Sequence, residues 1–177
     1  FEDVLVHGIV RDNQGRKMSK TLGNGVDPLD VIDEYGTDSL RMSLIIGTTP
    51  GNDIRYSNDK VEAASNFANK LWNASKFVLM QLEDIENFKE NSIEELDVSK
   101  MIDVDKWIIS KLNTLTKEVT ENIEKYDLGV ALQKIYDFIR NDFCDWYIEI
   151  VKPRLWDKEN ESRYTVQYIL NHCLCTS

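Results

Sequence analysis

The sequence predicts a mainly α-helical protein in which a small α/β element precedes an antiparallel helical bundle. Only 8 of the 177 residues are glycine and only 3 are proline, which favours helices over a loop-rich all-β fold. Apolar residues make up 42% of the chain, enough for a sizeable core, and from residue 58 onward they recur at helical spacing. The net charge of −10 counts against a general nucleic-acid-binding protein.

Two short segments of the first 57 residues are predicted to be strands. Residues 4–10 are apolar and β-rich, which is typical of a buried strand in a parallel sheet. Residues 53–56 have the composition of a second, shorter strand.

Two short helices are predicted between these strands. Asp27 and Pro28 have the residue types of an N-cap and a first helical position, and Gly36 fits the end of that helix. Thr37 is expected to cap the second helix. Residues 1–57 therefore form one α/β unit in our interpretation.

Residues 58–177 are predicted to form the helical bundle, which we expect to be incomplete at its C-terminal end. Helical spacing of apolar residues begins near residues 58, 105, 128 and 161, and an acidic connector covers 83–104. In the third helix, Phe143, Trp146 and Ile150 are spaced as one packing stripe. Pro153 is expected to stop that helix.

The cysteines and the apolar runs exclude several classes of protein. Three cysteines make no disulfide framework, and Cys173 and Cys175 lack the second Cys/His cluster of a zinc site, so no metal site is predicted. No run approaches 18 apolar residues, so no membrane span is expected. The start of the sequence is unlike a signal peptide, and we expect a segment of a longer chain.

The most informative segment is a glycine-flanked loop at residues 11–25. Lys17 and Lys20 stand three residues apart, with hydroxyl groups on Ser19 and Thr21. Lysines supply mobile positive charge, hydroxyls supply donors, and glycines let backbone N–H groups approach phosphate oxygens. The loop suits a polyphosphate, although it is not a Walker A pattern. By composition alone, a solvated basic surface loop is the simpler interpretation.

The first bundle helix presents a second candidate surface. The side opposite Ala64, Leu71 and Val78 contains no acid, although the chain has 31 acidic residues. It carries amides, two cations and one aromatic: Asn66, Asn69, Lys70, Asn73, Lys76 and Phe77. Amides can read base edges, lysines can meet phosphates, and Phe77 can stack on a base. The alternative is a solvated face with Phe77 packed under a neighbouring segment.

The loop sequence Lys17-Met18-Ser19-Lys20-Thr21 resembles the KMSKS signature of class I aminoacyl-tRNA synthetases, with Thr21 in place of the final serine. Residues 22–32 and 35–41 are similar to the subgroup that charges valine, isoleucine and leucine. Residues 66–74 and 143–149 are similar to valyl-tRNA synthetases in particular. The resemblance covers nearly the whole chain in the same order.

This resemblance implies that residues 1–57 are the end of a Rossmann-type catalytic domain with its stem-contact element, and that 58–177 bind the anticodon arm. It implies ATP, with Mg²⁺ as its counterion, and valine as substrates, and the tRNA for valine as partner. Lys17 and Lys20 match the family's catalytic lysines, and the ATP-binding loop is Lys17, Met18, Ser19, Lys20 and Thr21. The expected contacts to the anticodon stem-loop are Lys70, Asn73, Lys76 and Phe77.

The second nucleotide signature of the family, HIGH, does not occur in these 177 residues. We therefore expect the chain by itself to be inactive in amino-acid activation. A stand-alone tRNA-binding or helical interaction module without ligase activity is the alternative. The family further implies a cytoplasmic monomer with neither a membrane nor DNA as partner.

Overall fold

The computed structural model describes residues 2–83, 85 and 98–177. By its contacts the chain divides into two compact units. The first unit comprises residues 1–69 and 119–134, and the second comprises 70–118 and 135–177. The boundary after residue 57 stays a prediction. The mainly helical fold, with a small parallel sheet followed by a helical bundle, is confirmed.

The sheet of the first unit consists of two short parallel strands. Strand β1 (Val10–Arg11) pairs with β2 (Ile54–Arg55), with Val10 opposite Ile54. An ion pair of 2.5 Å between Arg11 Nε and Asp53 Oδ2 flanks this pairing. The expectation of parallel pairing is therefore confirmed.

The expected buried strand at residues 4–10 is wrong in its extent. Val4 is 79% exposed and Val6 is 69% exposed. The ladder stops at Val10 because the N–H of Ile9 donates to the Asp53 carboxylate at 2.9 Å instead of to a strand. Apolar composition predicted burial, but it could not predict where the hydrogen-bonded ladder ends.

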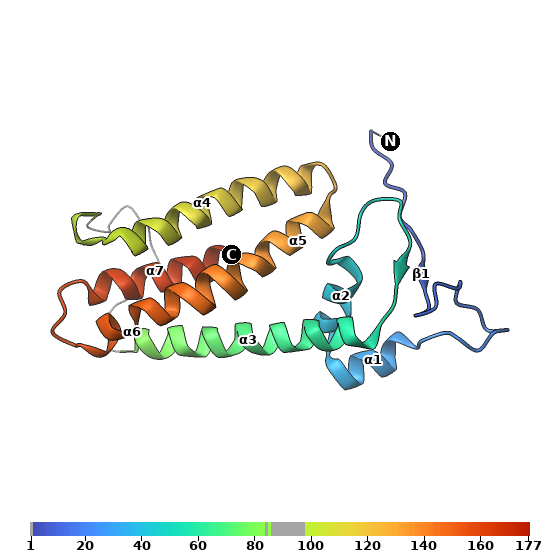
Figure 1. Ribbon diagram of the computed structural model, residues 1–177, viewed down its shortest axis with the longest axis horizontal. Helices are drawn as coiled ribbons and strands as arrows, with labels where there is room; N and C mark the ends of the chain where they lie inside the picture. Colours follow the sequence, from blue (N-terminus) through green and yellow to red (C-terminus); the bar gives the residue numbers. More distant parts are fainter. Residues whose placement is uncertain (1, 84, 86–97) are drawn as a thin grey trace. The chain divides into compact units, whose positions relative to one another are not determined.

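Helices α1 (Pro28–Tyr35) and α2 (Thr37–Ile45) pack against each other within the first unit (Figure 1). Asp27 caps α1 by accepting the Leu29 N–H at 2.9 Å, as expected. The prediction that Thr37 caps α2 is wrong, because Gly36, at φ 88°, both ends α1 and precedes α2 directly. Their small core joins Val31, Leu40 and Val61 with the half-buried side chains of Ile32, Tyr35, Leu44 and Tyr56.

Helix α3 (Asn58–Leu82) begins in the first unit and ends in the second. Its buried side chains are Val61, Ala64, Ala74 and Val78. The predicted inward face is therefore confirmed at Ala64 and Val78. The short helix η2 (Val98–Lys100) follows, and the rest of the expected acidic connector lies mostly outside the described residues.

The remaining helices are α4 (Asp103–Glu124), α5 (Leu128–Asp137), the π-helical η3 (Phe138–Tyr147), α6 (Ile148–Trp156) and α7 (Arg163–Thr176). Helices α5, η3 and α6 follow one another without a break from Leu128 to Trp156. Among the described residues, no helix is both long enough and apolar enough to cross a membrane.

Two expectations for η3 and α6 are wrong. Pro153 lies inside α6 and does not stop the helix, which continues to Trp156. The proline removes one backbone N–H donor from the helix. Of the expected stripe, Phe143 is fully buried, but Trp146 is 61% exposed and Ile150 is 46% exposed. The hydrogen bonds of a π-helix span one residue more than those of an α-helix, so the buried face moves to other positions such as Tyr147.

A buried polar network crosses the second unit. One carboxylate oxygen of Asp105, Oδ1, accepts hydrogen bonds from Tyr147 Oη and Arg154 Nη1, both at 2.9 Å. The other oxygen accepts the Ile102 N–H at 3.1 Å. Burial, and after it the neighbouring Asp105 carboxylate, raises the pKa of the Tyr147 phenol. The network joins α4, η3 and α6 through one fully buried acid.

Candidate functional site

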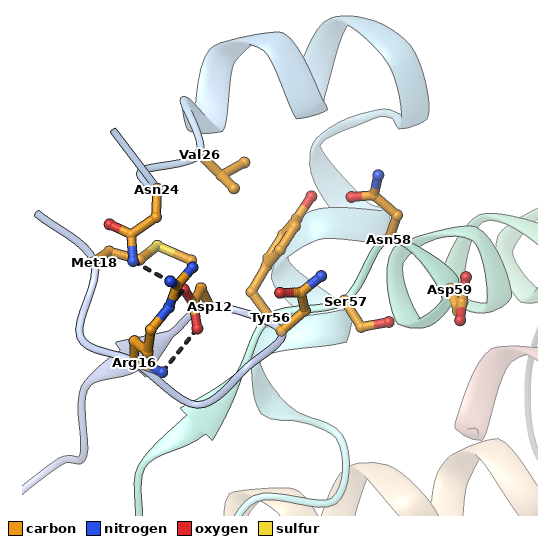
Figure 2. Close-up of a pocket in the computed structure, with 10 residues that line it drawn as sticks. Asp12, Arg16, Met18, Asn24, Val26, Tyr56, Ser57, Asn58 and Asp59 are labelled. Atoms are coloured by element: carbon orange, nitrogen blue, oxygen red, sulfur yellow. Dashed lines mark hydrogen bonds and ion pairs between the residues drawn. The ribbon is translucent and has the colours of Figure 1, made fainter. Parts of the chain in front are cut away.

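The lysine loop is organised around a buried carboxylate at its entry. Asp12 follows β1, is 6% exposed, and lies at the centre of the cluster that Figure 2 shows. Its Oδ1 accepts the backbone N–H groups of Gln14 at 3.0 Å and of Arg16 at 2.7 Å. Its Oδ2 accepts from Arg16 Nε at 2.7 Å and from Asn24 Nδ2 at 2.9 Å. The hydrogen bond from Asn24, followed by those from Arg16, lowers the pKa of Asp12 to about 2.

Asn24 holds the middle of the loop from its other end. Its Oδ1 accepts the Ser19 N–H at 2.9 Å, and its Nδ2 lies 3.3 Å from the Lys17 carbonyl oxygen. Ser19 Oγ in turn accepts the Leu22 N–H at 3.2 Å. Side chains at both ends of the loop therefore fix the backbone around the two lysines.

The predicted phosphate-binding residues divide into an exposed and a half-buried set. Lys17, Lys20 and Thr21 are exposed, while Met18 and Ser19 are half-buried. No ion pair joins either lysine to another described residue. This arrangement presents two ammonium groups to solvent from a backbone that is itself tied down, which suits an incoming anion.

A cavity of about 500 Å³ lies beside the loop. Figure 2 shows Met18 and Asn24 on one side of it and Tyr56 and Asn58 on the other. Of the five predicted ATP-binding residues Met18 lines the cavity, and neither Lys17 nor Lys20 does.

Neither Asp12 nor Asn24 is among the site residues that the sequence predicts. An aspartate followed by Asn13-Gln14-Gly15 is a typical start of a side-chain-stabilised turn, and that signal was available.

The outer face of α3 carries the predicted nucleic-acid contacts. Asn73 and Lys76 are exposed, whereas Lys70 and Phe77 are half-buried. Lys70 Nζ lies 2.5 Å from Asp145 Oδ1 on η3, so this cation already has an anionic partner. Asn73 and Lys76 on this face are therefore accessible to a ligand, whereas Lys70 can bind one only if its ion pair with Asp145 breaks.

Three large exposed apolar residues of α3 were missed. Trp72 is 67% exposed, and Leu79 and Met80 are also exposed. Trp72 lies one helical turn before Lys76, on the side of α3 that points away from Val78. The helical spacing that placed the amides outward could also have placed Trp72 there.

No group of three or more metal-ligating side chains forms within residues 2–83, 85 and 98–177. Among the cysteines, Cys144 and Cys173 are buried and Cys175 is exposed. Burial raises the pKa of the Cys144 thiol to about 11, so it is protonated at neutral pH.

Two protein-family models match the sequence. Residues 1–57 match the tRNA synthetases of class I (I, L, M and V), and residues 105–177 match the anticodon-binding domain of tRNA ligase. Together with the lysine loop and the helical bundle, these matches define a class I aminoacyl-tRNA synthetase segment.

The chain belongs to the valine–tRNA ligase family. It is 56% identical over 171 residues to the valine–tRNA ligase of Clostridium acetobutylicum, and 55% identical over 176 residues to that of Clostridium perfringens. These alignments cover 95% and 99% of this chain but 19% of each relative. The chain thus spans about a fifth of the length of the curated relatives it matches.

The fold is similar to those of other synthetases of this class. A Mycobacterium tuberculosis methionyl-tRNA synthetase in complex with methionyl-adenylate aligns with a TM-score of 0.72 at 24% identity. The alignment covers 96% of this chain and 32% of that one. A LeuRS–tRNA–LeuAMS complex from Agrobacterium radiobacter K84 aligns with a TM-score of 0.67 at 20% identity, over 96% of this chain and 20% of that one.

Proposed function

We propose that this chain is the part of a valine–tRNA ligase that supplies the ATP-phosphate loop and the anticodon-arm contacts. The observation that carries the proposal is the pair of exposed lysines, Lys17 and Lys20, on a loop whose backbone is fixed by Asp12 and Asn24. The identity of 55–56% to valine–tRNA ligases supports valine as the amino acid.

In the proposed reaction, a carboxylate oxygen of valine attacks the α-phosphorus of ATP. The bond from that phosphorus to the bridging oxygen breaks, which yields valyl-adenylate and pyrophosphate. Lys17 and Lys20 stabilise the negative charge that grows on the departing phosphates, and Ser19 and Thr21 support the loop. Mg²⁺ enters as the counterion of ATP.

The second part of the proposal concerns the tRNA for valine. The outer face of α3 offers the exposed amide of Asn73, the cation of Lys76 and the exposed indole of Trp72. Single-stranded nucleic acid is bound by groups of these three kinds: the amide can hydrogen-bond to a base edge, the cation can pair with a phosphate, and the indole can stack on a base. They support contact with the unstacked bases of the anticodon loop, and a cytoplasmic location follows from that partner.

The test is the charging of valine-specific tRNA by the full-length protein that contains this chain. We expect ATP-dependent attachment of valine and little attachment of leucine or methionine. Charging with one of those two amino acids in preference to valine would contradict the assignment.

The chain by itself is expected to bind valine-specific tRNA but not to form valyl-adenylate. Two lysines cannot orient valine and ATP without the remainder of the nucleotide site. Filter binding against an unrelated tRNA separates a tRNA-binding module from a helical interaction module, which would not discriminate. Valine-dependent ATP–pyrophosphate exchange by the purified chain would refute the expected inactivity.

A further inference from the structure

The two ends of the lysine loop are joined by one hydrogen bond between side chains. Asp12 and Asn24 are 12 residues apart, and Asn24 Nδ2 donates to Asp12 Oδ2 at 2.9 Å. Asp12 lies directly after β1, and Asn24 lies shortly before α1, so the bond closes the loop between two ordered elements.

Each member of this pair also holds the backbone next to a lysine. Asp12 accepts the N–H of Arg16, the residue before Lys17, at 2.7 Å. Asn24 accepts the N–H of Ser19, the residue before Lys20, at 2.9 Å. The exposed ammonium groups therefore extend from a segment that is anchored at the residue preceding each of them.

We propose that Asp12 and Asn24 are positioning residues for Lys17 and Lys20. They hold the backbone of residues 16–19 in the conformation from which both ammonium groups reach the phosphates of ATP. This inference rests on the proposed function, because it assigns the pair a role in valyl-adenylate formation.

The chemistry of the two side chains fits this role. A carboxylate only accepts hydrogen bonds, and Asp12 receives four, from Gln14, Arg16 twice and Asn24. An amide both donates and accepts, which lets Asn24 bind Asp12 and Ser19 at once. An amide at position 12 would turn its NH₂ group toward the NH₂ group of Asn24, and two donors cannot pair.

The experiment measures the first turnover of valyl-adenylate formation in the full-length protein, for Asp12→Asn, Asn24→Asp and the double exchange. Each single variant should lower the rate about 10-fold to 100-fold, since a small misplacement of a catalytic group is costly. The burst amplitude, which counts folded active sites, should not change, and the KM for ATP should change less than the rate.

The double exchange supplies the rescue. The amide introduced at position 12 would donate to the carboxylate introduced at position 24. That carboxylate would still accept the Ser19 N–H, so the bond that closes the loop is restored with its polarity reversed. The bonds from Arg16 Nε to position 12 and from position 24 to the Lys17 carbonyl are not restored, so the rescue is partial. We expect the rate of Asp12→Asn/Asn24→Asp to exceed that of either single variant. Additive losses would overturn the proposal.

Asp53→Asn is the matched control, because Asp53 is also an aspartate beside β1, but its hydrogen bonds go to Ile9 and Arg11 at the start of the loop and not to Arg16 or Ser19. It should lower thermal stability and leave the rate per active site unchanged. Single variants that lose burst amplitude at an unchanged rate would make Asp12 and Asn24 structural residues only. A wild-type protein without valine-dependent activity would overturn the proposed function itself.

Discussion

The ammonium group of Lys70 on α3 lies 2.5 Å from Oδ1 of Asp145 on η3. The sequence predicts the same role for Lys70 and Lys76, as phosphate contacts on one helix face. The ion pair separates them, because a phosphate that approaches Lys70 must first displace a carboxylate, whereas Lys76 is exposed. Their contributions to tRNA binding should therefore differ.

Lys76→Ala should reduce the slope of log affinity for valine-specific tRNA against log salt by roughly one, since one phosphate contact is lost. Lys70→Ala should change the slope by less. Asp145→Asn should strengthen binding by about 0.2–1 kcal/mol, the range of an exposed ion pair, because Lys70 is released. A salt titration of the three variants measures this. Equal slopes for the two lysine variants would mean that the ion pair does not compete with tRNA.

Trp72→Ala should weaken tRNA binding by about 1–3 kcal/mol if a base stacks on the indole. The side chain is 67% exposed, so its removal should leave the melting temperature nearly unchanged. Phe77→Ala is the comparison, because this half-buried ring next to the buried Val78 should lower both affinity and stability. Thermal melts beside binding curves make the distinction. Full affinity in Trp72→Ala would remove this residue from the interface.

The outward face of α3 shows how far the sequence could predict the site. Helical spacing correctly separated Ala64 and Val78 from the exposed Asn73 and Lys76, because a straight α-helix follows one period. The same reasoning failed on η3, where Trp146 is exposed because the π-helical turn changes the period. The local sequence pattern did not predict this π-helical turn.

The loop gives the complementary case. Its composition indicated that the lysines could bind a polyphosphate, and the structure shows that both Lys17 and Lys20 are exposed. The bonds that shape the loop join Asp12 to Asn24 across 12 residues, and such a pairing depends on the closed turn between them rather than on either residue type. The pairing of Asp105 with Arg154, 49 residues later, could not be predicted either, because the packing of α4 and α6 brings these two residues together.

Arg154→Met should destabilise the second unit by about 3–5 kcal/mol, because it leaves the fully buried Asp105 carboxylate without its cation. Lys152→Met is the matched control on the same helix, since its ion pair with Glu149 is partly exposed and worth about 0–1 kcal/mol. Urea unfolding of this chain compares the two. Similar losses in both variants would show that the buried pair contributes no more than a surface pair.

The low pKa of Asp12 predicts that the free energy of unfolding decreases at acid pH. Its pKa falls from the ordinary 3.8 to about 2 in the folded chain, so the unfolded state binds the proton first. The stabilisation is present in full above about pH 4 and is lost as the pH falls toward 2. Thermal melts from pH 5 to pH 2 should show a steeper loss for the wild type than for Asp12→Asn. Parallel curves would contradict the assignment.

In the proposed function, the exposed lysines of the loop act on the phosphates of ATP during valine activation. Valine-dependent ATP–pyrophosphate exchange by the full-length protein tests it most directly, with Lys17→Ala and Lys20→Ala measured beside the wild type. We predict exchange by the wild type and a kcat lowered roughly 10²–10³-fold in Lys20→Ala, by analogy with the loss of one oxyanion-hole donor, with a smaller change in the KM for ATP. Exchange at the wild-type rate in both variants would contradict the claim and leave the loop as a solvated surface feature.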